Sequence, residues 1–192
     1  MMPRALLLIL ALTTLAGCGH EQVHGIEPDA AFPSATLTDW VTHGDQLSVI
    51  RITGETPPTL PKDWKNSGGL IGRKVTVEIE RTVWHRAHAP RRAVPFRMQA
   101  WGWMMESDQH ADSPIHPIIV RNAPRLKVGG RYLAVLMRLD YGWTPLNDDA
   151  VMTLDGDTVT GHVDAGAPTA PVAALRGKTV AEAAAVVRRA DR

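Results

Sequence analysis

The chain of 192 residues contains a single cysteine, Cys18, and no second long apolar run after its N-terminal segment. One cysteine cannot form a disulfide within the chain, which excludes the small secreted domains that depend on disulfide bonds. The shortage of apolar runs excludes a chain that crosses a membrane repeatedly. We therefore expect one tethered domain that is stabilised by core packing alone.

Neither sign of charge is in clear excess, since the chain has 21 Lys and Arg residues and 20 Asp and Glu residues. A near-neutral domain lacks the positive field that nucleic-acid binding requires, so we expect no nucleic acid as a partner. The charges are unevenly distributed: residues 62–97 carry nine Lys and Arg against three acids, and residues 139–175 carry six Asp and no Lys or Arg. These segments either steer a charged partner or, as we expect, pair with each other or face water.

Recognisable catalytic motifs are absent as well. No Gly-x-Ser-x-Gly elbow occurs, and the stretch SGGLIG lacks the Lys-Ser/Thr pair of a phosphate-binding loop. The acidic pairs Asp148-Asp149 and Asp155/Asp157 fall in predicted turns, where Asp is favoured because its side chain bonds to the backbone. We expect no catalytic residue and no cofactor.

The N-terminal segment has the composition of a secretory leader. Arg4 supplies a positive charge, and the apolar segment 5–15 is too short to cross a bilayer, which takes about 20 residues. The following stretch, Leu15-Ala16-Gly17-Cys18, resembles the lipobox of bacterial lipoproteins at every position. The resemblance implies that the Cys18 thiol receives a diacylglyceryl group and that signal peptidase II cuts after Gly17. The alternative is a plain secretory leader with an incidental cysteine.

The lipoprotein resemblance implies a location outside the cytoplasm, with lipidated Cys18 anchored in the cell membrane or the outer membrane. Two or three acyl chains anchor far more firmly than one, because each buried CH₂ contributes roughly 0.8 kcal/mol. Residues 1–17 are then the lipoprotein signal peptide. Residues 18–39 show no sustained hydrophobic period and contain Pro28 and Pro33, so we predict a flexible tether there.

Hydrophobic periodicity predicts a β domain over residues 40–164. The clearest strand is RKVTVEIERTVW, in which apolar and polar residues alternate. The stretch PFRMQAWGWM alternates as far as Gly102, where we expect a bulge. The stretch RYLAVLMRL is apolar on both faces, as a central strand is, and Asp155-Gly156-Asp157 predicts a hairpin turn.

Five or six strands with glycine-rich turns favour a small barrel. The stretches VTVEIERTVW, LKVGGRYLAVLMRLDYGWTPL and LDGDTV, within roughly residues 45–163, resemble the OB-like and netrin-like domains of bacterial secreted and lipid-anchored proteins. The resemblance implies a mainly β fold, a five- or six-stranded OB-like barrel with one C-terminal α-helix. Residues 165–177 are predicted to be a linker, and residues 178–190 the helix, because Thr179 and Glu182 have capping-box spacing.

Two groups of histidines invite a metal interpretation. His85 and His88 stand three apart, and His110 and His116 flank Asp112. Imidazole and carboxylate groups suit zinc or copper, yet no pair has the helical, Glu-bearing spacing of a metalloprotease. Because both groups fall in predicted loops, we expect no metal, and the four histidines stay candidates for an alternative function.

Trp101 and Trp103 are the candidate ligand-binding residues. On a regular strand, residues two apart share a face, and exposed indoles can stack against sugars, bases or partner proteins. The other interpretation is that both indoles cover the core, since tryptophan is mostly buried.

The leading hypothesis is a non-enzymatic, lipid-anchored envelope lipoprotein whose β domain binds a ligand or partner. One alternative is a metal-handling or hydrolytic envelope protein that uses His85, His88, His110 or His116. A second is cell-wall glycan binding through Trp101 and Trp103. The expected partners are the membrane, through the N-terminal lipid, and an envelope protein or glycan.

Overall fold

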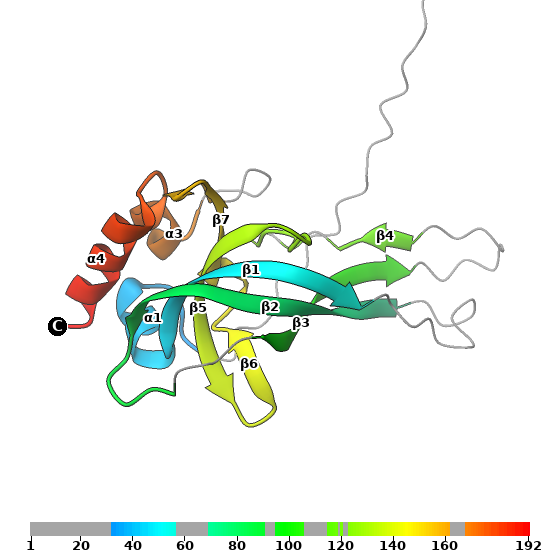
Figure 1. Cartoon of the computed structure of the whole chain (residues 1–192), viewed down its shortest axis with the longest axis horizontal. Coiled ribbons are helices and arrows are strands. Elements are labelled where there is room, and N and C mark those ends of the chain that lie inside the picture. The colour runs from blue at the N-terminus through cyan, green and yellow to red at the C-terminus, as the bar shows by residue number, and fades with distance from the viewer. Residues whose placement is uncertain are drawn as a thin grey trace, which may run out of the picture.

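The computed structural model describes residues 32–56, 69–90, 95–105, 115–118, 120, 123–161 and 168–192. Over these residues the chain is mainly β, as predicted: eight strands form one antiparallel sheet, and three α-helices lie against it (Figure 1). The strands are β1 (Gln46–Thr56), β2 (Gly69–His85), β3 (Phe96–Met105), β4 (Ile115–Pro117), β5 (Arg131–Leu139), β6 (Gly142–Pro145), β7 (Val151–Asp155) and β8 (Thr158–Val159). The helices are α1 (Leu37–His43), α3 (Ala170–Leu175) and α4 (Val180–Ala190), with a 3-10 turn, η1, at Asp148–Ala150.

Strands β1 and β5 lie at the centre of the sheet and are buried on both faces. They pair with each other without a register shift, so side chains alternate regularly between the faces. On β1, Leu47 and Val49 belong to one core cluster, and Ile50 and Ile52 belong to the other. Strand β5 pairs with β1, β6 and β7, which confirms the central position predicted for it.

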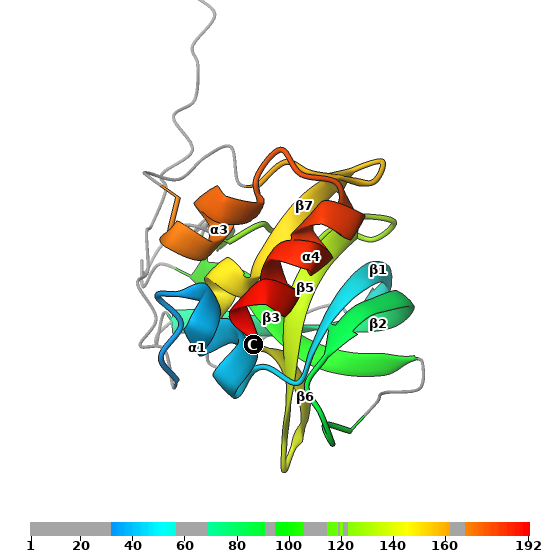
Figure 2. The ribbon, with the colours of Figure 1, turned by 90° about the vertical axis from the view of Figure 1, so that its left-hand side faces the viewer.

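The helices pack on one face of the sheet, where they cover the first core cluster (Figure 2). Trp40 of α1, Leu175 of α3 and Val187 of α4 are fully buried against Leu133 and other residues of β5. Burial of a side chain of this size stabilises the fold by about 1.5–3 kcal/mol. None of the described helices is long and apolar enough to cross a membrane.

The boundaries of the helices agree with the sequence at the C-terminus and differ elsewhere. Helix α4 forms where it was predicted, with a capping box between Thr179 and Glu182. Helix α1 begins at Leu37, inside the predicted tether, and α3 lies inside the predicted linker. Each is only six or seven residues long, which is too short for a helical hydrophobic period to be recognised.

The opposite face of the sheet curls over the second core cluster. The strand order is β4-β3-β2-β1-β5-β7-β8, with β6 paired to β5. Strand β3 comes close to β6, but no backbone pairing joins the two among the described residues. The sheet is therefore open, and it has eight strands where five or six were expected. The additional short strands β4 and β6 contain Pro117 and Pro145 and show too few residues for a period of two.

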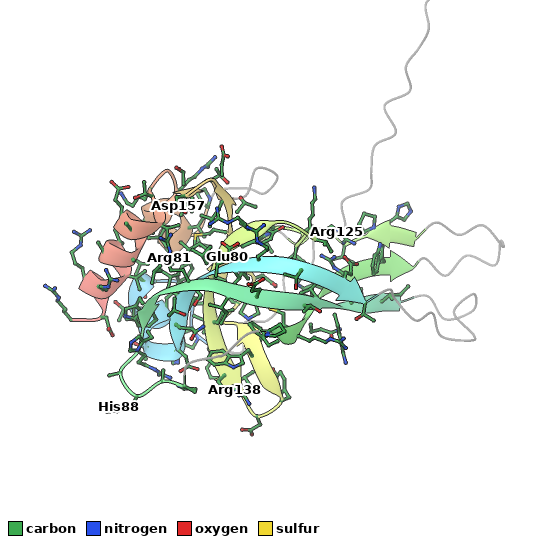
Figure 3. All side chains as sticks on the ribbon, in the orientation of Figure 1. Glu80, Arg81, His88, Arg125, Arg138 and Asp157 are labelled. Atoms are coloured by element: carbon green, nitrogen blue, oxygen red, sulfur yellow. The ribbon has the colours of Figure 1, made fainter. Side chains whose placement is uncertain are left out.

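Among the described residues, one ion pair connects the basic segment 62–97 directly to the acidic segment 139–175, and Arg131 links the two segments indirectly. Arg81 of β2 lies 3.2 Å from the carboxylate of Asp157 in the β7–β8 turn. Both residues are labelled in Figure 3. Arg131 of β5 bridges Glu80, at 2.8 Å, and Asp157, at 3.7 Å. Burial favours a higher pKa for Glu80, but the hydrogen bonds and charges of Arg131 and Arg51 outweigh it and lower that pKa. Some of the unevenly distributed charges are thus paired with each other within the fold.

Candidate binding cavity

A cavity of about 580 Å³ lies on the side of the second core cluster. The start of β2, the middle of β3, residues 123–126 and the chain from Thr144 to Asp149 form its wall. This volume falls within the range of small-molecule sites in proteins. The apolar part of the wall includes Ile71, Met98, Ala100, Ile118 and Leu146, and the polar part includes Ser34, Arg73, Asn147, Asp148 and Asp149.

A β-bulge directs Trp101 toward this cavity. Between two consecutive cross-strand pairs, β2 has one residue, Gly72, whereas β3 has two, Trp101 and Gly102. The bulge predicted at Gly102 is therefore confirmed. A Cβ atom on Gly102 would lie 1.9 Å from the carbonyl oxygen of Ile71, so the two strands can approach this closely only with glycine. The extra residue changes the alternation and leaves Trp101 in the cavity wall.

Arg73 is the buried polar support of the bulge, with a side chain only 3% exposed. Its Nε donates to the carbonyl oxygen of Trp101 at 2.7 Å, and Nη1 donates to the Glu55 carboxylate at 2.6 Å. Its Nη2 donates to the carbonyl oxygen of Leu126 at 2.5 Å. Because its charge is paired and each nitrogen is hydrogen-bonded, Arg73 can be buried without a large cost. It joins β1, β3 and residues 123–126 around the cavity.

Trp101 and Asp148 form the polar contact at the centre of the site. The indole N–H of Trp101 donates to Asp148 Oδ1 at 2.8 Å, across 47 residues of sequence. Burial raises the pKa of Asp148, and the hydrogen bond from Trp101 opposes that rise. Burial also raises the pKa of Asp149; a polar contact with the Thr169 side chain opposes that rise, and the neighbouring charge of Asp148 adds to it. Within the described part of the chain, no Lys, Arg or His forms an ion pair with either carboxylate.

The turn that carries the two aspartates is fixed by Asn147. Its Oδ1 accepts a hydrogen bond from the backbone N–H of Ala150 at 2.8 Å, which caps η1. Its Nδ2 donates to Ser34 Oγ at 2.7 Å. The carbonyl oxygen of Ser34 accepts in turn from the buried indole of Trp40, at 3.1 Å. The aspartates therefore stand on a turn that is held by the core.

Trp103 lies next to the cavity in a different environment from Trp101. The guanidinium carbon of Arg125 is 5.0 Å from the centre of the Trp103 ring, a cation–π contact. Arg125 Nη1 also donates to the carbonyl oxygen of Gly102 at 2.7 Å. Trp101 contributes to the cavity wall and Trp103 does not. The bulge thus prevents the two indoles from forming the regular two-residue platform that the sequence suggested.

His85 and His88 lie at one end of the sheet, and His116 lies at the other. His85 ends β2 with its Nδ1 3.1 Å from the carbonyl oxygen of Arg86, and exposed His88 follows in a turn with a φ of 62°. His116 of β4 pairs with Met104, near the other end of the 17-residue strand β2. Figure 3 shows His88 far from Arg125, which stands near β4.

These positions do not bring the predicted metal ligands together. His110 and Asp112, like Cys18, fall outside the described residues. Among the described residues, no three His, Cys, Asp or Glu side chains lie close enough to hold a metal ion. The metal interpretation therefore gains no support from His85, His88 and His116.

Asp148 and Asp149 are site residues that the sequence pattern does not single out. They were interpreted as turn residues, and η1 is indeed a turn, but it also forms part of the cavity wall. The contact between Trp101 and Asp148 depends on the bulge, which the sequence indicated, and on the packing of β6 near β3, which has no local signal in the sequence. A weak indication existed, because Asn147-Asp148-Asp149 concentrates polar side chains between two apolar segments.

Comparison with family models, curated proteins and solved structures found no match to this chain.

The arrangement is suited to binding a small molecule. The cavity has an apolar wall, one indole, and two adjacent carboxylates whose pKa values are raised by burial. Its described wall contains no His, Cys or Lys that would serve as nucleophile or base. Few convergent polar groups in a mainly apolar concavity are typical of ligand sites.

Proposed function

We propose that this protein is a lipid-anchored lipoprotein of the bacterial envelope whose β domain binds a small molecule without transforming it. The cavity beside Trp101 and Asp148 is the observation that supports binding. The anchor rests on the lipobox Leu15-Ala16-Gly17-Cys18. Together they describe a binding domain held close to a membrane surface.

We also propose that the domain is related to the OB-like barrels. Without its shortest strands, the sheet has the order β3-β2-β1-β5-β7. Strands β1, β2 and β3 form an antiparallel meander, and β5 and β7 continue the sheet on the other side of β1. This order is compatible with a partly open, five-stranded Greek-key barrel. A closed barrel of this order would join β3 to β7; in the described structure the close approach of β3 is instead to β6, which pairs with β5.

The anchor is tested by the mass of the protein made with its leader in a bacterium and extracted from membranes. We expect a chain that begins at Cys18 and carries two or three acyl groups. The matched variant Cys18→Ser should retain the leader and carry no acyl mass. A wild-type chain cut elsewhere, or cut without acylation, would reduce the N-terminus to a plain secretory leader.

Binding in the cavity is tested with the neutral fluorescent probe N-phenyl-1-naphthylamine. We expect saturable binding to the purified full chain, and loss of binding in Ala100→Phe, because the added ring occupies space in the cavity wall. The control Ala87→Phe places the same ring in the exposed turn after β2 and should bind as the wild type does. Equal binding by both variants would place the probe outside the cavity.

A second candidate function is glycan binding, which the position of Trp101 beside two carboxylates favours. Aromatic faces stack against sugar rings, and carboxylates accept hydrogen bonds from sugar hydroxyls. Titration with chitooligosaccharides tests it: displacement of the neutral probe would support glycan binding in the cavity. The absence of displacement would leave the small-molecule proposal in place.

A further inference from the structure

We propose that the cavity selects small organic cations: an ammonium group lies against the carboxylates of Asp148 and Asp149, and an apolar body lies against Trp101 and the apolar wall. This inference rests on the proposed binding function and adds the chemical class of the ligand. It is carried by the distribution of charge and of apolar surface around one cavity.

Two arginines, Arg73 and Arg125, line the cavity together with Asp148 and Asp149, but the described structure shows no ion pair between these arginines and the two carboxylates. Arg73 is neutralised by Glu55 and also donates to two backbone carbonyl oxygens. Arg125 lies over the Trp103 ring and donates to the carbonyl oxygen of Gly102. Asp148 accepts one hydrogen bond, from a neutral indole, and neither it nor Asp149 forms an ion pair in the described structure. A cationic ligand supplies the missing counter-charge.

The remaining surface of the cavity suits the apolar part of such a ligand. Ile71, Met98 and Ala100 line it from β2 and β3, with Ile118 and Leu146 from the connecting segments. The N–H of Trp101 is already used by Asp148, so the indole offers its ring to a ligand. An ammonium group near an indole face gains a cation–π attraction.

Other classes of ligand fit this wall less well. Calcium takes six to eight oxygen ligands, and the described wall offers only two adjacent carboxylates together with isolated amide and hydroxyl groups. An anion would meet both carboxylates. A neutral ligand would leave those carboxylates without a counter-charge in a partly desolvated site, which is costly. Burial raises the pKa of both groups, as expected for carboxyls that lack a cation.

The test compares three probes that share a phenyl ring and differ in charge: 2-phenylethylamine, 2-phenylethanol and phenylacetate. In calorimetric titrations of the purified full chain at pH 7, we expect the amine to bind at least ten-fold more tightly than the alcohol, and phenylacetate to bind most weakly. Equal affinities for amine and alcohol would overturn the inference. The binding function itself would survive that result, because the neutral naphthylamine probe tests it separately.

Variants of the two carboxylates locate the effect. Asp148→Asn keeps an oxygen that accepts from Trp101 but removes the charge, and we expect about ten-fold weaker amine binding with unchanged alcohol binding. Asp149→Asn should act in the same direction. The control Asp140→Asn, at the exposed turn between β5 and β6, should bind all probes as the wild type does. Unchanged amine affinity in both Asp148→Asn and Asp149→Asn would place the cation elsewhere.

The pH dependence of amine binding distinguishes charge selection by Asp148 and Asp149 from a purely structural role of these residues. Amine affinity should fall as the pH is lowered from 7 toward 4, because protonation of the carboxyls removes the attraction, whereas alcohol affinity should stay constant. The other charged groups of the wall are Arg73 from β2 and Arg125 from residues 123–126, and both stay protonated over this range. Parallel pH profiles for amine and alcohol would contradict charge selection.

Discussion

Gly102 determines, at the scale of single residues, where the indole of Trp101 lies. The bulge brings the backbone of β2 so close that no side chain fits at residue 102. Trp101 then meets Asp148, and its ring becomes part of the cavity wall. Backbone sterics thus place the functional side chain.

The bulge makes Gly102→Ala a severe change. The new Cβ would lie 1.9 Å from a backbone oxygen, which cannot move aside as a side chain can. We expect the free energy of unfolding to fall by about 3 kcal/mol or more, measured by urea denaturation. Gly72→Ala is the matched control: its Cβ would meet the end of the Gln99 side chain, which can move, so a loss below about 1 kcal/mol is expected. Similar losses for both would show that the bulge does not depend on Gly102.

Asp148 and Asp149 should make stability fall as the pH rises. Because burial raises their pKa, the folded chain binds more protons than the unfolded chain above an unfolded pKa of about 4. Their stabilising contribution is complete below that pH and is lost as the pH rises through the folded pKa values. The double variant Asp148→Asn/Asp149→Asn should gain stability relative to the wild type between pH 4 and pH 7, in denaturant titrations at each pH. A constant difference across this range would refute the raised pKa values.

Only part of this site could be predicted at the scale of residues. The alternation that breaks at Gly102 indicated the bulge, and the indoles were candidates from the start. The sequence places Asp148 in a turn. Its contact with Trp101 joins residues 47 positions apart, so no local pattern predicts that contact. Such a contact follows from the packing of β6 near β3, which leaves no local pattern.

At the scale of the elements, the sequence of helix α4 marks both of its ends. Thr179 Oγ1 accepts from the backbone N–H of Glu182, and the Glu182 carboxylate accepts from the backbone N–H of Thr179. Arg188 and Arg189 in the last turn complement the helix dipole. These local rules made the helix predictable. Helix α1 also has a capping box, between Thr36 and Asp39, but α1 and α3 have only seven and six residues and depend on the packing of two or three buried side chains.

Removal of this cap should loosen α4 in particular. Thr179→Ala loses the hydroxyl acceptor, and we expect about 1 kcal/mol less stability, with faster amide hydrogen exchange in the first turn of α4. Thr179→Ser retains the hydroxyl and should behave nearly as the wild type does. Exchange that rises equally in β1 and β5 would mean that α4 unfolds only with the whole domain.

At the scale of the whole molecule, one sheet divides the core into two clusters with different surroundings. The helices cover the first cluster (Figures 1 and 2). The cavity lies beside the second cluster. The sequence indicated a mainly β domain and its central strand, because β5 is apolar on both faces. The sequence did not indicate that the sheet stays open, because closure depends on the short strands β4 and β6, which have three and four residues.

The ion pairs around Glu80 and Asp157 connect β1, β2, β5 and the β7–β8 turn across this sheet. Arg131→Gln should nevertheless cost only about 0.2–1 kcal/mol, because water and salt screen pairs that are partly exposed. Denaturation in low and high salt checks this, and the difference between variant and wild type should shrink as salt is added. Because Arg131 and Arg51 lower the pKa of Glu80, this contribution is present above the ordinary Glu pKa and is lost as the pH falls through the lowered value.

The contact between Trp101 and Asp148 is best observed through the six indole N–H signals of the protein in a two-dimensional nitrogen–proton NMR spectrum. With the signals assigned by Trp→Phe variants, 2-phenylethylamine should shift the Trp101 signal, while those of buried Trp40 and Trp84 stay in place. The same Trp101 signal should move with pH above the ordinary Asp range, because its acceptor titrates there. A Trp101 signal that responds to neither the amine nor pH would contradict both the site and the proposed ligand class.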